Sequence, residues 1–261
     1  MTAPNVTTYL ITGANRGLGK GLVSAYLLKP DNVVIAAVRN PNDATSLALQ
    51  DLPKHPSSTL IIVKIESASE TDPKTAIAEL QSKYNIVSLD VVVANAAISQ
   101  IWPAVAEAKA DDMMRHFHVN VVGIVFLFQA VLPLLQASSS ASPDSTPQPL
   151  PAKFVTITSS AGSIGNQEQV DVPNAAYGPS KAALNWITKK IHLEHPDIIA
   201  FPLDPGWVQT DMGNAGARAF GLKEAPLSID ESINGIVQVV DHAIRETSGK
   251  FMNYKGGQQA W

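Results

Sequence analysis

Short runs of β-branched and apolar residues alternate with longer stretches of helical periodicity along most of this chain. The runs typical of strands are Thr7–Thr12, Val33–Ala37, Leu60–Ile65, Leu89–Ala94, Phe154–Thr158 and Ile198–Leu203. The helical stretches are Gly17–Leu28, Ala44–Leu52, Asp72–Tyr84, Ala110–Leu135 and Ala175–Glu194. Several strand runs are continuously apolar, as expected of parallel strands buried on both faces. Consecutive βα units of this kind form a parallel sheet with right-handed crossovers.

The alternation predicts one domain over residues 1–261, since single α/β domains of this length are common. We expect an α/β, doubly wound Rossmann-type sheet of about seven parallel strands with helices on both faces. Ser138–Pro151 reads SSSASPDSTPQPLP and is predicted to be a flexible surface loop. A domain linker is the alternative, but the βα alternation resumes directly after it.

Composition and charge exclude several classes of partner. The net charge is −4 without a basic run, so neither nucleic acid nor an anionic membrane surface is expected. The absence of cysteine excludes disulfides and thiolate metal ligands. The N-terminal MTAPNVTTYL does not resemble a signal peptide. The apolar stretch Val119–Leu135 is interrupted by Asn120, Gln129 and Pro133, which favours a buried helix over a membrane span. We expect a cytoplasmic protein.

The first predicted strand runs into a glycine-rich turn, Thr12–Gly19, that reads TGANRGLG and leads into an apolar helix. Glycines at positions 13, 17 and 19 allow a tight turn and a close approach of the backbone to a pyrophosphate, and the helix offers unpaired N–H groups there. The spacing G-x-x-x-G-x-G differs from the common dinucleotide fingerprint. An ordinary strand-to-helix turn is the alternative, but the position at the first βα junction favours cofactor binding.

The end of the second strand indicates which nicotinamide cofactor is bound. An NAD site commonly has a carboxylate there for the ribose 2′-hydroxyl, whereas an arginine accommodates a 2′-phosphate. Here the strand ends in Val38-Arg39-Asn40, and Arg16 in the glycine turn can reach the same region. Two cations without an acid favour NADPH or NADP+ over NADH. Two ordinary solvated arginines are the alternative.

Tyr177 and Lys181 are four residues apart at the start of a predicted helix, so they lie on one face. A nearby ammonium lowers the pKa of a phenol toward neutrality, which suits proton exchange with a substrate. A pair of this spacing is common by chance, and a surface pair is the alternative.

Two further polar residues argue against a chance occurrence of the Tyr177 and Lys181 pair. Ser159 follows a strand at its carboxyl end, where open α/β sheets bind ligands. Asn120 stands among valines and needs hydrogen-bond partners if buried, either as a structural plug or as part of a polar relay.

In these features the chain resembles the short-chain dehydrogenase/reductase family along essentially its whole length. The matching features, in order, are the T-G-x-x-x-G-x-G turn, Asn95-Ala96-Ala97, Asn120, Ser159, Tyr177-x-x-x-Lys181 and Pro205-Gly206. The segments YLITGANRGLGK, GSIG from Gly162 and FMNYKG from Phe251 are similar to the carbonyl-reductase-like branch that contains fungal norsolorinic acid ketoreductases.

The resemblance implies a mechanism and a set of site residues. Tyr177 would protonate the substrate carbonyl, Ser159 would hold its oxygen, Lys181 would bind the nicotinamide ribose and lower the tyrosine pKa, and Asn120 would order a water toward Lys181. The implied cofactor-binding residues are Gly13, Asn15, Arg16, Gly17, Leu18, Gly19, Arg39, Glu66, Asn95, Ala96, Lys181, Pro205, Gly206, Val208 and Thr210.

The chain departs from the family pattern at two places. Ala97 stands where the family has glycine, so the close backbone approach there is altered. The gap from Ser159 to Tyr177 is 18 residues, longer than usual, and Gln167–Pro173 is predicted to form a loop at the pocket rim. Ser160 is adjacent to Ser159, and the choice between them rests on counting back from Gly162.

Residues 206–228 are predicted to form a substrate lid. The predicted pocket residues are Ile101, Trp102, Trp207, Met212 and Phe220. They indicate a bulky apolar, aromatic or polyketide-type carbonyl, with ordinary packing beneath a loop as the alternative. His116 and His118 face different directions on a helix, and no metal site is predicted.

These features predict NADPH-dependent reduction of a ketone or aldehyde to an alcohol by a homodimer or homotetramer. An NAD(P)+-dependent alcohol dehydrogenase and an NADPH-binding redox sensor without turnover are the alternatives. Retention of Tyr177, Lys181, Ser159 and Asn120 argues against the sensor, because a protein that only binds the cofactor does not need all four.

Overall fold

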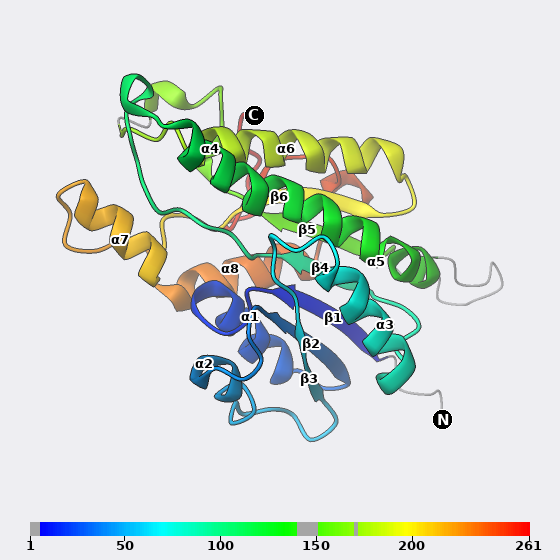
Figure 1. Ribbon diagram of the computed structural model, residues 1–261. Helices are drawn as coiled ribbons and strands as arrows, with labels where there is room; N and C mark the ends of the chain where they lie inside the picture. The colour runs from blue at the N-terminus through cyan, green and yellow to red at the C-terminus, as the bar shows by residue number, and fades with distance from the viewer. Residues whose placement is uncertain (1–5, 140–150, 170–171) are drawn as a thin grey trace.

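The computed structural model describes residues 6–139, 151–169 and 172–261. These residues form a seven-stranded sheet in the order β3-β2-β1-β4-β5-β6-β7, and each neighbouring pair is parallel (Figure 1). The strands are β1 (Thr7–Thr12), β2 (Asn32–Val38), β3 (Thr59–Lys64), β4 (Val91–Ala94), β5 (Lys153–Ile157), β6 (Ile199–Asp204) and β7 (Met252–Asn253). The predicted single-domain, doubly wound α/β fold is confirmed.

Helices cover both faces of the sheet (Figure 1). They are α1 (Gly17–Leu27), α2 (Ala44–Leu47), α3 (Asp72–Tyr84), α4 (Ala110–Phe117), α5 (Gly123–Ser139), α6 (Tyr177–Glu194), α7 (Asp211–Ala219) and α8 (Ile229–Asp241). One hydrophobic core lies between the sheet and the pair α1 and α8, and the other between the sheet and α3, α5 and α6. Strands such as β2 are apolar throughout because both of their faces are covered.

The strand order reverses beside β1, since β2 lies on one side of it and β4 on the other. The loops that follow β1 and β4 therefore diverge and leave a crevice at the carboxyl ends of the strands. Open α/β sheets bind their ligands at such a point. The glycine turn follows β1 and Asn95 follows β4, so the topology brings both to this crevice.

Most predicted element ends are within two residues of the observed ones, but two differences have a clear physical reason. The helix predicted over Ala44–Leu52 ends at Leu47, and the chain continues in turns that bury Leu49 in the core. The strand predicted from Leu89 begins at Val91, because the N–H of Leu89 donates to the carbonyl of Leu134 in α5 rather than to a strand.

The long helix predicted over Ala110–Leu135 consists of α4, a π-helical turn at His118–Val122 and α5. By length and apolarity, Ala110–Ser139 could cross a membrane. Its inward side chains, including Leu127, Val131 and Leu134, are instead buried against the sheet. It is a core helix, as its polar interruptions predicted.

Three elements were not located by the sequence patterns: α7, α8 and the two-residue strand β7. Ser138 and Ser139, the first two residues of the predicted loop 138–151, belong to α5 instead. Its residues 140–150 lie outside the described residues, as do residues 170–171 of the predicted rim loop, where Gln167–Gln169 form a short 3-10 helix.

Candidate active site

The glycine turn after β1 has a backbone conformation that requires glycine. Gly13 and Gly17 have φ of +63° and +51°, in the left-handed region. A Cβ on Gly19 would lie 2.1 Å from the carbonyl oxygen of Gly13, so α1 starts in direct contact with the turn. Leu18 packs toward the core. The unpaired N–H groups at the start of α1 and the compact turn fit a pyrophosphate.

Thr12 and Asn95 join this turn to the end of β4. Asn95 Nδ2 donates to the Thr12 carbonyl at 2.8 Å, and the N–H groups of Asn95 and Ala96 both donate to Thr12 Oγ1 at 3.0 Å. Two of the predicted cofactor segments are therefore held together at the crevice. Thr12 was not among the predicted site residues, although a hydroxyl residue closing an apolar strand is a recognisable signal.

Two exposed arginines lie on the adenosine side of the turn. Arg39 Nε is 3.7 Å from the Glu66 carboxylate, and Arg16 is exposed within the turn. An exposed ion pair of that length contributes little and leaves the guanidinium free to bind a stronger anion. Asn15 Nδ2 donates to Thr45 Oγ1 at 2.6 Å, which ties the turn to α2. Two exposed guanidinium groups are thus available at this edge for an anion.

The structure brings Ser159, Tyr177 and Lys181 together. Tyr177 is the first residue of α6 and is partly exposed, whereas Lys181 is 2% exposed with its Nζ 5.6 Å from the centre of the Tyr177 ring. The Lys181 ammonium donates to the Ile157 carbonyl at 2.8 Å. The side chain of Ser159 hydrogen-bonds with Tyr177. Of the two adjacent serines, Ser159 therefore adjoins the tyrosine.

Burial controls the proton affinities of this cluster. Burial lowers the pKa of Lys181 to about 7, and attraction to Asp204 opposes the change. Burial also raises the pKa of Tyr177; the hydrogen bond with Ser159 acts in the opposite direction, and the charge of Asp204 adds to the rise. The expected lowering of the tyrosine pKa by Lys181 is therefore not found, because burial of the phenol outweighs the hydrogen bond that lowers its pKa. At neutral pH Tyr177 is protonated, as a proton donor must be.

Asp204, the last residue of β6, is a site residue that the sequence reasoning missed. Its buried carboxylate accepts from the N–H of Gly206 at 3.1 Å and from Gln259 Nε2 at 2.8 Å. Its charge acts on both Tyr177 and Lys181. An acid at the end of an otherwise apolar strand, at the ligand-binding edge, could have identified it.

Asn120 is fully buried in the π-helical turn, a feature often found at functional sites. Its side chain accepts from the N–H of Ile98 at 2.8 Å and donates to the Ile98 carbonyl at 2.9 Å. It also donates to Ser180 Oγ at 3.0 Å. Its contacts thus join the loop after β4 to α6 at the residue preceding Lys181.

Three of the predicted pocket residues form an aromatic group. The rings of Trp102 and Phe220 meet edge to face with centres 5.8 Å apart, and those of Trp207 and Phe220 do so at 6.2 Å. Ile101 is partly buried on the same loop as Trp102, and Met212 on α7 is 37% exposed. Trp102, Trp207 and Phe220 are therefore brought together, as predicted pocket residues should be.

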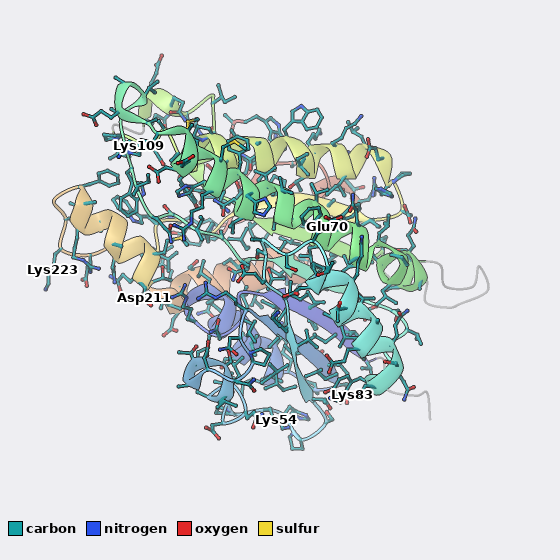
Figure 2. All side chains as sticks on the ribbon, viewed as in Figure 1. Lys54, Glu70, Lys83, Lys109, Asp211 and Lys223 are labelled. Carbon is teal, nitrogen blue, oxygen red and sulfur yellow. The ribbon has the colours of Figure 1, made fainter. Side chains whose placement is uncertain are left out.

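The segment predicted as a lid is anchored at its base. Val208 and Leu227 form an isolated parallel bridge, and α7 lies between them. A Cβ on Gly17 would lie 3.3 Å from the Thr210 methyl group, so the segment starts beside the glycine turn. Figure 2 shows Asp211 and Lys223 near the two ends of its projecting part.

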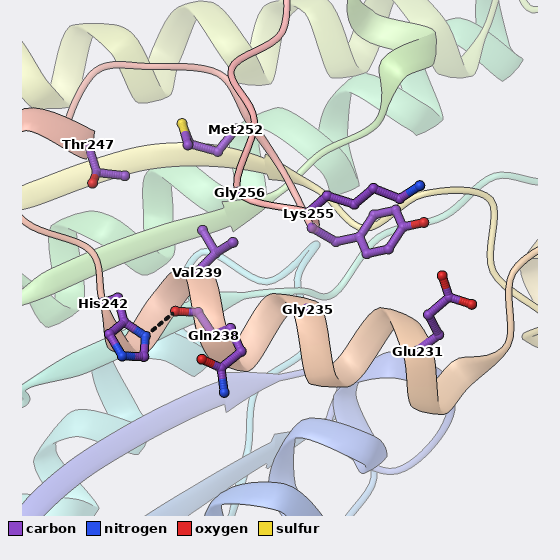
Figure 3. A pocket seen from close by; sticks show the side chains of 10 residues that line it. Glu231, Gly235, Gln238, Val239, His242, Thr247, Met252, Lys255 and Gly256 are labelled. Carbon is purple, nitrogen blue, oxygen red and sulfur yellow. Dashed lines mark hydrogen bonds between the residues drawn. The ribbon is translucent and has the colours of Figure 1, made fainter.

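A separate cavity of about 540 Å³ lies between α8 and the turn after β7 (Figure 3). Its lining includes Glu231, His242 and Tyr254 and none of the predicted site residues.

In the described parts of the chain, histidines and acids do not gather in groups of three or more that could hold a metal ion. His116 is buried and His118 exposed, as their spacing predicted.

Comparison with known proteins agrees with this geometry. The family profile described as short chain dehydrogenase matches residues 7–219. The chain belongs to the short-chain dehydrogenase family. It is therefore an NAD(P)H-dependent oxidoreductase, as predicted.

Individual relatives cover nearly the whole chain. Norsolorinic acid ketoreductase nor1 of Dothistroma septosporum is 44% identical over 97% of this chain and 91% of its own length. Short chain dehydrogenase gsfK of Penicillium aethiopicum is 43% identical over 97% of this chain and 99% of its own. Among solved structures, NADPH-bound carbonyl reductase from chicken fatty liver has a TM-score of 0.85 and 31% identity, covering 98% of this chain and 99% of its own.

Proposed function

We propose that this protein reduces a ketone or aldehyde to an alcohol with NADPH. The observation that carries the proposal is the convergence of Ser159, Tyr177 and Lys181 at the carboxyl edge of the sheet, next to the glycine turn. The raised pKa of Tyr177 keeps the phenol protonated at neutral pH, which is the form that can donate a proton to a carbonyl oxygen.

The chain's residues divide the work of binding the cofactor. The turn from Gly13 to Gly19 would bind the pyrophosphate, Arg16 and Arg39 the 2′-phosphate, and Lys181 the nicotinamide ribose. Asn95, Ala96 and Glu66 line the adenosine side, while Pro205 to Thr210 adjoin the turn from the other side. When bound, NADPH supplies the hydride.

The catalytic residues act on the carbonyl oxygen of the substrate. Ser159 donates a hydrogen bond that holds this oxygen, and Tyr177 transfers its proton to it. The charged form of Lys181 stabilises the phenolate that remains. Asn120 holds Ile98 and Ser180, and so fixes the start of α6 against the loop after β4.

Replacement of Arg39 by aspartate tests the cofactor assignment. We expect Arg39→Asp to weaken NADPH binding by roughly a hundredfold and to change NADH binding little, because a charge-assisted pair with the 2′-phosphate is replaced by repulsion. Titration of both cofactors by fluorescence measures this. Equal affinity of the wild type for NADPH and NADH, or unchanged NADPH affinity in the variant, would contradict it.

For the substrate we propose a flat aryl ketone; the ketoreductase relatives are named for norsolorinic acid. The group Trp102, Trp207 and Phe220 supports this, since aromatic faces bind planar ligands. The test is NADPH oxidation with norsolorinic acid, simpler aryl ketones and short aliphatic ketones. Tight NADPH binding without oxidation across the whole panel would favour a redox sensor instead.

Assembly and the lid remain predictions. The exposed Met114 on α4 and the exposed Trp186 and Leu193 on α6 support pairing of copies through these helices. The anchored base of residues 206–228 supports a lid over the substrate, with α7 as its moving part.

A further inference from the structure

We infer that His116 is a positioning residue that sets the place of Trp102 in the substrate site, and with it the fit of a flat aryl ketone. The inference rests on the proposed function for its substrate, but its geometry stands on the contacts of the loop 98–103. This loop leaves β4 and runs between α4, α6 and α7.

His116 is 1% exposed and uses both of its ring nitrogens. Nδ1 lies 2.7 Å from the carbonyl oxygen of Asp112, one turn earlier in α4, and Nε2 lies 3.3 Å from the N–H of Gln100. Because a carbonyl only accepts, Nδ1 must carry the proton. Nε2 is then the acceptor for Gln100, so the neutral ring matches both partners.

Asn120 extends this contact four residues further along the helix. It binds both the N–H and the carbonyl of Ile98, while His116 binds the N–H of Gln100. The side chains of Asn120 and His116 thereby hold the loop backbone at Ile98 and at Gln100. Such contacts restrict a segment that has no strand partner of its own at these positions.

The held backbone leads directly to Trp102. Its indole N–H donates to Ser99 Oγ at 3.1 Å, and its ring packs edge to face on Phe220 of the α7 segment. The next residue, Pro103, accepts from the N–H of Ala175 at 3.0 Å, two residues before Tyr177. A shift of this loop would therefore change the distance between the aromatic group and the proton donor.

Two conservative variants of His116 distinguish the hydrogen bond at Nε2 from the one at Nδ1. The amide of His116→Gln reaches the position of Nε2 and can accept from Gln100, whereas that of His116→Asn reaches only the position of Nδ1. We expect His116→Asn to raise KM for a flat aryl ketone roughly tenfold with kcat changed less, since one hydrogen bond at the loop is lost. His116→Gln should restore most of the wild-type KM. Turnover of a short aliphatic ketone and NADPH affinity should be unchanged in both variants.

Amide hydrogen exchange of the peptide over residues 98–103 provides a readout independent of activity. Exchange should be faster in His116→Asn than in the wild type and close to the wild type in His116→Gln. His242→Asn is the matched control, because His242 Nδ1 also lies 2.9 Å from the carbonyl oxygen four residues earlier, that of Gln238, but the residue is exposed directly after α8. It should alter neither readout.

Two results would overturn the inference: unchanged exchange of residues 98–103 in His116→Asn, or an equal rise of KM for the aryl and the aliphatic ketone. The second would indicate a general structural role. Failure of the wild type to reduce any ketone would refute the proposed function instead, while the exchange measurement would still decide whether His116 holds the loop.

Discussion

Tyr177→Phe is expected to lower kcat/KM for ketone reduction by about a thousandfold, because general acid catalysis contributes on this scale. The variant removes one hydroxyl at the start of α6 and leaves the ring in place. Ser159 keeps a hydroxyl for the carbonyl oxygen, but without the phenol the developing alkoxide receives no proton. NADPH affinity should change by less than about twofold, since the proposed cofactor contacts lie on other residues.

Single-turnover oxidation of NADPH and cofactor titration together measure this outcome. Tyr84→Phe is the control, because it deletes the same hydroxyl at the end of α3, away from Ser159 and Lys181. Its turnover should equal that of the wild type. Turnover retained in Tyr177→Phe would refute the role of the phenol as proton donor.

Lys181→Met is expected to separate activity from stability. The ammonium is 2% exposed, and burial holds its pKa at about 7, so the folded protein is penalised for keeping the charge. A methionine of similar volume removes that penalty but also leaves the Ile157 carbonyl without its donor, so the melting temperature should change little. The kcat/KM should fall by at least about a hundredfold, because the phenolate loses its neighbouring cation.

Lys153→Met is the matched control and should show the reverse pattern. Lys153 is also buried, but its ammonium donates to the carbonyls of Val240 at 2.7 Å and Asp241 at 2.9 Å, at the end of α8. Its loss leaves these carbonyls without that donor and should destabilise the fold by about 1–3 kcal/mol. Activity should be kept. Thermal melting and steady-state assays compare the two variants, and a large loss of stability in Lys181→Met with activity retained would contradict the assignment.

Local sequence patterns were sufficient to predict those parts of the candidate site that depend on residues close together in the chain. The turn Thr12–Gly19 was recognisable because its glycines have backbone conformations that other residues avoid. Ser159 was preferred to Ser160 by counting back from Gly162, and the structure shows why a glycine is needed at position 162. A Cβ at Gly162 would lie 2.6 Å from the main chain at Lys181, so this glycine lets the Ser159 loop contact the catalytic helix.

Other features depend on groups far apart in the chain. The pKa of Tyr177 depends on burial by several elements and on Asp204, which no spacing rule connects to it. The helix predicted as one piece contains a π-helical turn at Asn120, whose partners Ile98 and Ser180 lie in distant segments. His116 belongs to the same class, since its ring binds a loop 16 residues away.

The sequence by itself therefore determined the order of βα units, the glycine-rich turn and the candidate residues for proton transfer. These depend on backbone propensity and on spacings of a few residues, which are local properties. Tertiary structure alone decided the proton affinities of Tyr177 and Lys181, the partners of Asn120 and His116, and the edge-to-face packing of Trp102 and Trp207 on Phe220. Burial and hydrogen bonding between distant segments arise only when the strands are brought into one sheet, and the electrostatics of Tyr177 arise with them.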